Sequence, residues 1–159
     1  MRGLLGIPAL AIVAGAMLVF AAAANAAGSN AVAYRTQVNA ICRSYTPRFK
    51  SLESDLAAAK KAGDERRYGY DLGLMLALTY KQGLRVEHAP VPTDARKQMA
   101  APLQLLHSVD LQLRSTLAAA VAGDVQGFAT ESTKLAKLAG PLNSRFDAVG
   151  LRDCGSNQQ

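Results

Sequence analysis

One apolar stripe limits the fold of this chain more than any other feature of its sequence. The stripe recurs at alternating spacings of four and three residues, through Val38, Cys42, Tyr45, Phe49, Leu52 and Leu56. This spacing is typical of a helix that packs along its length against other helices. Residues 29–62 are therefore predicted to form one long helix. Pro47 lies inside it and is expected to kink it, because proline removes a backbone donor.

Glycine and proline divide the rest of the chain into three more helical segments. Ala62-Gly63-Asp64 and Ala122-Gly123-Asp124 each combine a glycine, which suits a left-handed helix end, with an aspartate that can cap the next helix. Pro90 and Pro92 mark the remaining joint, after which Thr93 is expected to cap a helix. The predicted segments are residues 64–87, 94–122 and 124–149.

The predicted fold is all-α: an up-down-up-down four-helix bundle with Pro-kinked helices, closed by one disulfide. Each segment carries an apolar face, and β-branched residues are sparse. Pro141 is expected to bend the fourth helix, and Pro102 either bends the third or leaves residues 94–101 as a separate short turn. In the second helix, small residues spaced four apart are expected to let a neighbouring backbone come close; they are Gly69, Gly73 and Ala77.

The first 26 residues have the features of an export signal. Arg2 precedes a long apolar run, and Ala24-Asn25-Ala26 matches the small-x-small pattern of a signal peptidase site. Cleavage would leave residues 27–155 as the bundle and 156–159 as a disordered tail. The protein is then expected to be secreted or held in the cell envelope, with no stable membrane span. The run is also long enough to cross a bilayer, so an uncleaved anchor is the alternative.

The two cysteines are Cys42, on the stripe of the first helix, and Cys154, just past the end of the fourth. In an exported protein two cysteines are most simply one disulfide. Their Cα atoms should then lie about 4.4 to 6.8 Å apart. This requires the tail after Gly150 to fold back, with Leu151 covering the core and the fourth helix packed near the first. A redox role would favour a close pair such as Cys-x-x-Cys, which the sequence lacks.

The stretches "NAICRSYTPRF" and "GLRDCG" resemble a group of small, alanine-rich, exported helical proteins of actinobacteria. Members of that group carry an early "AIC" cysteine followed by an asparagine, a C-terminal "GLxxC" cysteine and often a Pro-rich joint, here "APVPTD". This chain departs from the pattern at Ser44-Tyr45-Thr46, where an asparagine is common. The resemblance implies export, helices and the disulfide. It implies no catalytic residue, because the group has no established activity.

Neither histidine belongs to a recognisable catalytic or metal site. His88 lies in the joint, and His107 has Asp110 three residues on and so on the same helical face. A stable metal site needs three or four ligands, so a surface histidine with a local partner is expected. Covalent haem needs Cys-x-x-Cys-His, which is absent, and Met75 and Met99 are expected to fill the core. With no nucleophile elbow, phosphate loop or catalytic carboxylate pair, neither a cofactor nor enzymatic activity is expected.

One cluster in the second helix has the composition of a recognition surface: Arg66, Arg67, Tyr68, Tyr70 and Asp71. Tyrosine and arginine often anchor such surfaces, although an ordinary helix start with surface cations is the alternative. Asp71 is expected to face solvent or to pair with a nearby arginine. The formal net charge of +6 is spread over scattered cations, so nucleic acid is not an expected partner.

Two functions are compatible with these features. The first is an exported, non-enzymatic module, monomeric or weakly dimeric, that binds an unidentified protein or envelope component through a helix face. The second is an extracytoplasmic carrier that holds a small molecule between its helices. A carrier requires a cavity lined by the apolar stripes. An alanine-rich core is expected to pack closely and leave little room, so the sequence favours the first function.

Overall fold

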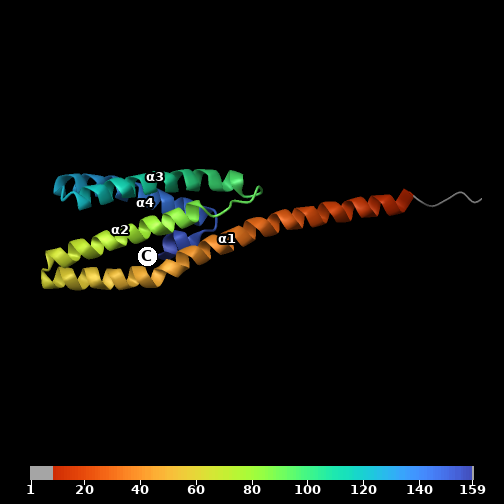
Figure 1. The fold of residues 1–159 in the computed structure, drawn as a ribbon. Helices are drawn as coiled ribbons and strands as arrows, with labels where there is room; N and C mark the ends of the chain where they lie inside the picture. Colours follow the sequence, from red (N-terminus) through yellow and green to blue (C-terminus); the bar gives the residue numbers. More distant parts are fainter. Residues whose placement is uncertain (1–8, 159) are drawn as a thin grey trace, which may run out of the picture.

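The computed structural model describes residues 9–158, and the side chains of residues 30–157. Its four long helices are α1 (Ala9–Ala62), α2 (Glu65–Glu87), α3 (Arg96–Val121) and α4 (Val125–Ala148). Two short 3-10 turns follow, η1 (Arg152–Cys154) and η2 (Ser156–Gln158). Figure 1 shows the four helices side by side, with successive helices running in opposite directions. The prediction of an all-α four-helix bundle is confirmed, and no strand occurs in the described residues.

The first helix is longer than predicted. It begins at Ala9 rather than near residue 29, and in Figure 1 it continues past the other three helices at its N-terminal end. The added residues are rich in alanine, the strongest helix former, which accounts for the missing break. The predicted signal peptide, residues 1–26, begins in residues 1–8, which lie outside the described part. Its cleavage stays a prediction.

No helix in the described chain combines the length and the apolarity that a membrane crossing needs.

All three expected helical prolines lie within helices: Pro47 in α1, Pro102 in α3 and Pro141 in α4. In Figure 1, α1 bends part-way along its length, as expected for a helix that contains Pro47. The prolines therefore shape the helices without ending them.

The two Ala-Gly-Asp turns end and restart helices as the sequence predicts. Gly63 and Gly123 have φ angles of 66° and 68°, in the left-handed region that glycine adopts without strain. Asp64 and Asp124 each accept a hydrogen bond from the backbone amide three residues later, at 3.0 and 2.8 Å. Both turns lie at the same end of the bundle in Figure 1.

The joint between α2 and α3 differs from its prediction. Thr93 does not cap a helix, because the backbone turns once more before α3 starts: the Ala95 amide donates to the Pro92 carbonyl at 3.0 Å. Ala95 therefore precedes the helix and has no side chain that could cap it. The neighbouring Asp94 carboxylate instead accepts from the Ala31 amide at 3.2 Å, which links this joint to α1.

The helices pack in chain order, α1 on α2, α2 on α3 and α3 on α4. The fourth side of the bundle is not formed by a helix pair, because α4 does not pack on α1. In the described chain no Cα atom of α4 lies within 8 Å of a Cα atom of α1 or α2. The turn η1 contacts both α1 and α4 and fills the space between them. The expected packing of the fourth helix against the first is therefore replaced by packing through the C-terminal segment.

The core draws on all four helices, the α2–α3 joint and the C-terminal segment. Its buried members are Tyr34, Val38, Cys42, Val86, Ala89, Ala95, Met99, Leu106, Val109, Leu113, Leu142, Phe146, Leu151 and Cys154. The same segment continues into η2, so the tail expected to be disordered from residue 156 is ordered through Gln158. The Asp147 carboxylate anchors it by accepting from the Ser156 amide at 3.2 Å.

The small residues of α2 do not make the close approach that their spacing suggests. A Cβ atom added at Gly69 or Gly73 would meet nothing within 4 Å. Both glycines line a groove whose other wall is the end of α3, the α3–α4 turn and the start of α4. The close approach occurs further along α2, at Gly83, where a Cβ atom would fall 2.4 Å from Oδ1 of Asp110.

Candidate functional site

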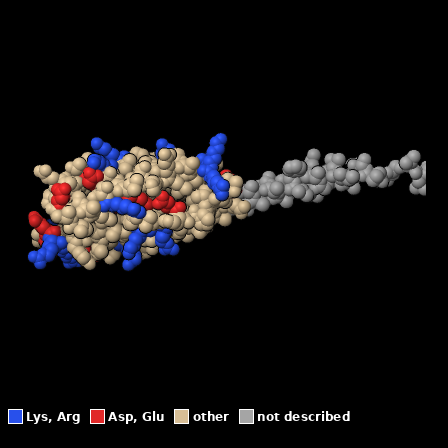
Figure 2. All heavy atoms as spheres, turned by 45° about the horizontal axis from the view of Figure 1, so that its top comes forward, with Lys and Arg blue, Asp and Glu red and all other residues tan. Residues whose placement is uncertain are grey.

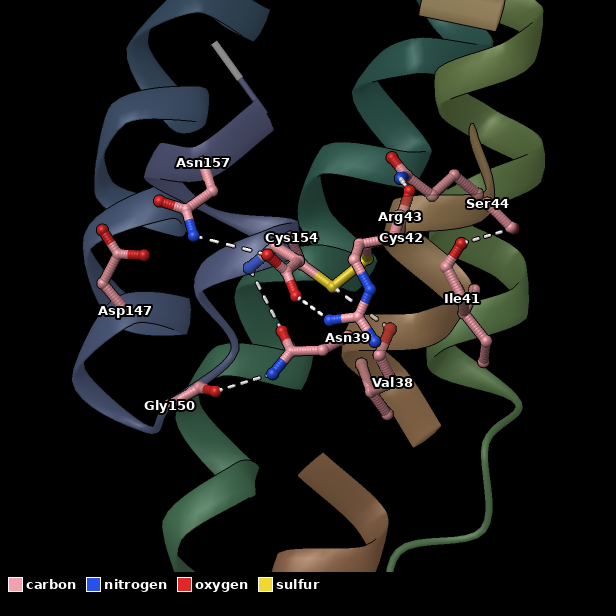
Figure 3. Close-up of a disulfide and its surroundings, with 12 residues drawn as sticks. Val38, Asn39, Ile41, Cys42, Arg43, Ser44, Asp147, Gly150, Cys154 and Asn157 are labelled. Carbon is pink, nitrogen blue, oxygen red and sulfur yellow. Dashed lines mark hydrogen bonds and ion pairs between the residues drawn. A yellow bond between two sulfur atoms is a disulfide. The ribbon is translucent and has the colours of Figure 1, made fainter. Parts of the chain in front are cut away.

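A disulfide holds the C-terminal segment in the gap between α1 and α4. Cys42 and Cys154 are bonded, with their Cα atoms 5.2 Å apart, as the sequence predicts (Figure 3). Gly150, with a φ of 83°, turns the chain after α4. Leu151 is then fully buried in the core, also as predicted. The bond joins residues 112 positions apart and so fixes the fourth side of the bundle.

Asn39 clamps the same segment from α1, and sequence reasoning missed it. Its Nδ2 donates to the Gly150 carbonyl at 3.0 Å, and its Oδ1 accepts from the Asp153 amide at 3.1 Å (Figure 3). The Arg43 guanidinium pairs with the Asp153 carboxylate one turn further along. Asn39 lies beside the apolar stripe and not in it, so the helical periodicity carried no signal for this role.

A cavity of about 190 Å³ lies where the helices and the C-terminal segment meet. Roughly 150 Å³ is enough to admit benzene in an apolar protein interior. The wall is mostly apolar and includes the disulfide together with Leu76, Val86, Leu106, Leu113, Leu142 and Phe146. The expectation that the alanine-rich core leaves little room is therefore wrong. The space exists because α4 stands away from α1 and α2.

The cavity reaches the surface between α2 and α4. Ala139 on α4 is exposed although it lines the cavity, and Thr79 on α2 and Asn143 on α4 are half-buried. Ala139 therefore stands at the mouth, where its small side chain leaves a passage.

Asp110 is the one charged side chain among the residues that line this cavity. It is 2 % exposed, and neither of its carboxylate oxygens accepts a hydrogen bond from a donor in the described residues, although its protonated form hydrogen-bonds to the Glu87 side chain. Gln82 is also buried, but its Nε2 donates to the Cys42 carbonyl at 3.3 Å. Buried polar groups are almost always paired in native proteins, so Asp110 marks a position at which a partner is needed.

Burial raises the pKa of Asp110 to about 7, and the negative charge of the neighbouring Glu87 adds to the rise. The positive charges of Arg114 and His107 lower the pKa of Asp110 but do not cancel the rise. The carboxyl group is thus near its midpoint of ionisation at neutral pH, where a change of partner can change its charge.

The expected local pairing of His107 with Asp110 is not made. His107 is exposed as predicted, but its Nδ1 lies 2.8 Å from Oε1 of Glu87 on α2. Asp110 points into the bundle instead, because three residues fall about 60° short of a full helical turn and so place the two side chains in different surroundings. Among the described residues, no three His, Cys, Asp or Glu side chains gather as a metal site would require.

The predicted recognition cluster on α2 divides into two parts. Arg67 forms ion pairs with Asp55 at 2.9 Å and with Asp71 at 3.5 Å. Asp71 is therefore paired with an arginine, as expected, and it is buried at 6 % exposure. Arg66, Tyr68 and Tyr70 remain on the surface.

Apolar side chains are exposed around the end of the bundle that carries the two Ala-Gly-Asp turns. Tyr70 is 67 % exposed, and Val121 and Val125, on either side of the second turn, are 89 % and 79 % exposed. A groove of about 280 Å³ lies between α2 and the second turn, lined by Gly69 and Gly73 on one side and by the α3–α4 turn on the other. This end of the molecule is the second candidate site.

The basic side chains form no single patch on the face that Figure 2 shows. Blue side chains are distributed around the bundle, with acidic side chains between them and a largely uncharged surface elsewhere. A nucleic-acid surface would need cations gathered along one face or groove. The face drawn in Figure 2 thus lacks the gathered cations of a nucleic-acid surface.

The chain matches no protein-family model, no curated protein and no solved structure. The resemblance to the exported actinobacterial group stays an expectation, and the function is argued from the two sites alone.

Proposed function

We propose that this protein is an exported, non-enzymatic carrier that holds a small, largely apolar molecule in the cavity between its helices. The observation that carries the proposal is the buried carboxyl group of Asp110, which accepts no hydrogen bond, in an apolar cavity large enough for a ligand. The sequence favoured a surface-binding module because it suggested a closely packed core. The feature required of a carrier, a cavity lined by the apolar stripes, is present.

The energetics of the cavity support a ligand. Leaving a buried polar group without a hydrogen bond costs about 1–3 kcal/mol, and more if the group is charged. The apolar wall lacks contacts across the empty volume as well. A ligand that fills the cavity and pairs with Asp110 would offset both costs.

Binding without turnover fits the residues at the cavity. None of the side chains that line it is a serine, lysine or histidine, and its two cysteines are joined to each other. The Thr79 hydroxyl donates to the Met75 carbonyl at 2.9 Å within its own helix. A nucleophile with an adjacent base, which covalent catalysis needs, is thus not assembled at this wall.

Export supports the same proposal. The signal-like residues 1–26 would direct the chain out of the cytoplasm. A disulfide persists in oxidising compartments, and this one forms part of the cavity wall. We therefore place the carrier in the cell envelope or outside the cell, as a monomer or weak dimer.

A pair of phenylalanine variants on α4 tests the proposal. Ala139→Phe puts a large side chain at the cavity mouth, whereas Ala136→Phe changes an exposed residue of α4 that does not line the cavity. Each protein would be titrated with small apolar fragments and followed by two-dimensional NMR. We expect resonances of the cavity residues to shift in the wild type and in Ala136→Phe, and not in Ala139→Phe. Binding that survives Ala139→Phe unchanged, or no binding to the wild type, would contradict the proposal.

The turn end of the bundle supports a second candidate function, recognition of a protein partner in the envelope. We propose that such a partner inserts an apolar side chain into the groove beside Gly73, with Tyr70 and Val121 as contacts. Exposed apolar residues near the turns favour this candidate, and one of them, Val125, lines the groove itself. Tyr70→Ala and Val121→Ser should each abolish capture of the partner from an envelope extract. Leu111→Ser, a change at an exposed leucine of α3 away from both turns, is the control; equal loss in all three variants would dismiss this surface.

A further inference from the structure

The cavity wall carries one kind of charge only. Asp110 is the single ionisable group among the residues that line it, because the two cysteines are bonded to each other. The neighbouring Glu87 adds a second negative charge next to Asp110. The cations nearest to Asp110 are engaged outside the cavity. Arg114 lies over the Tyr80 ring at 5.2 Å, and His107 pairs with Glu87. A cationic ligand is favoured by this arrangement, and an anionic one is opposed.

The position of the Asp110 carboxyl is fixed by close packing. It lies against the backbone of α2 at Gly83, where even a methyl group would overlap its Oδ1. Both carboxylate oxygens nevertheless lack a donor. Gln82 uses one N–H of its Nε2 on the Cys42 carbonyl and keeps its second N–H and its Oε1. The wall carries no lysine, arginine or histidine, so a cation that neutralises the Asp110 carboxylate has to come from the ligand, and an ammonium group brings three donors with its charge.

We infer that the ligand is a small organic amine, bound as its ammonium ion with Asp110 as the counter-ion and its apolar body in the rest of the cavity. The inference rests on the carrier function proposed above. The size of the cavity limits the ligand to about six to ten heavy atoms, since roughly 150 Å³ holds the six of benzene.

Binding of an amine should be linked to the release of a proton. Burial raises the pKa of Asp110 to about 7 in the empty protein, and an ammonium group beside it favours the ionised form. Affinity for the amine should therefore rise between about pH 5 and 8. The other charged groups that act on Asp110 are Glu87 on α2 and His107 and Arg114 on α3. Because the charge of His107 acts on Asp110, the pH series is repeated with His107→Gln.

Three probes of nearly equal shape test the inference: benzylamine, benzyl alcohol and benzoate. Their binding to the oxidised protein is measured by NMR titration at pH 8, for the wild type and for Asp110→Asn, which keeps the shape of the side chain. We expect benzylamine to bind the wild type at least tenfold more tightly than benzyl alcohol, and benzoate to bind most weakly. In Asp110→Asn the preference for benzylamine should disappear while benzyl alcohol still binds.

The outcomes separate the two proposals. If benzyl alcohol or benzoate binds the wild type as tightly as benzylamine, the ligand is not an amine, and the carrier function stands. The same conclusion follows if Asp110→Asn, shown by its NMR spectrum to be folded, retains the full preference for benzylamine or if affinity does not rise with pH in the His107→Gln protein. If none of the three probes binds the wild type, the carrier function fails together with the inference.

Discussion

Gly83 of α2 and Asp110 of α3 pack so closely that a Cβ atom at position 83 would lie 2.4 Å from Oδ1 of Asp110. The absence of a side chain at Gly83 is thus what allows a carboxyl group to sit between the two helices. This contact joins α2 to α3 beside the cavity and fixes how the two helices lie against each other.

Gly83→Ala should destabilise the protein even though alanine is the better helix former. The added methyl group must displace the Asp110 carboxyl or separate α2 from α3, and overpacking of this kind costs about 1–3 kcal/mol. Gly73→Ala, on the same helix with nothing within 4 Å of the new Cβ atom, should instead stabilise the fold by about 0.5–1 kcal/mol. Urea unfolding measures both changes, and equal effects of the same sign would contradict the contact.

Asp110 should make the protein less stable as pH rises toward neutrality. Burial raises the pKa of Asp110 from 3.8 to about 7, so the folded chain binds more protons than the unfolded chain between these values. The free energy of unfolding therefore falls as pH increases through about 4 to 7, and levels off above that range. The full effect is at most about 4 kcal/mol, since a tenfold change in proton affinity corresponds to about 1.36 kcal/mol.

Comparison with Asp110→Asn isolates this dependence. Urea unfolding of both proteins at several pH values between 4 and 8 should give curves that diverge, with the wild type losing stability relative to the variant as pH rises. Parallel curves would show that Asp110 has an ordinary pKa in the folded protein.

Removal of the disulfide should cost a large part of the stability. The double variant Cys42→Ala, Cys154→Ala frees a closed loop of 112 residues, and loss of a native disulfide from a small exported domain typically costs about 2–5 kcal/mol. The released segment would also uncover the gap between α1 and α4, so binding of apolar fragments in the cavity should weaken. Thermal unfolding and fragment titration measure these effects; a change below about 1 kcal/mol would mean that the clamp at Asn39 suffices alone.

Asn39→Ala tests that clamp. The change removes both hydrogen bonds of the clamp, each worth about 0.5–1.5 kcal/mol at this exposed to half-buried position. Gln37→Ala removes an exposed side chain two residues earlier on the same helix and should stay within about 0.5 kcal/mol of the wild type. Two variants of equal stability would show that the Asn39 hydrogen bonds do not hold the tail.

The helix boundaries at the two Ala-Gly-Asp turns follow from the sequence because they depend on chemistry within a few residues. Gly63 and Gly123 adopt the left-handed conformation, and Asp64 and Asp124 cap the next helix, with little influence from the rest of the fold. The disulfide is also predictable, since a chain with two cysteines allows one intramolecular pairing. Thr93 shows the limit: an extra turn of backbone after Pro92 moved the helix start beyond it.

The cavity and its carboxyl group could not be predicted in this way, because they depend on how helices are placed against each other. Helical spacing put Asp110 on the face of His107, whereas the register of α2 against α3 brings Glu87 to His107 and Gly83 to Asp110. The distance of α4 from α1 and α2 likewise has no signature in any single helix. The alanine content suggested a closely packed core, whereas the distance of α4 from α1 and α2 leaves a cavity in it.

In many domains the last few residues can be trimmed with little effect. Here the final side of the bundle is supplied by residues 151–154, which bring a buried leucine and half of the disulfide. The α1–α2 and α3–α4 hairpins are local in sequence, whereas the link between α1 and α4 is made by residues 151–154. A variant that lacks these residues would keep all four helices and lose that link, so the segment after α4 acts as a structural element of the bundle and not as a tail.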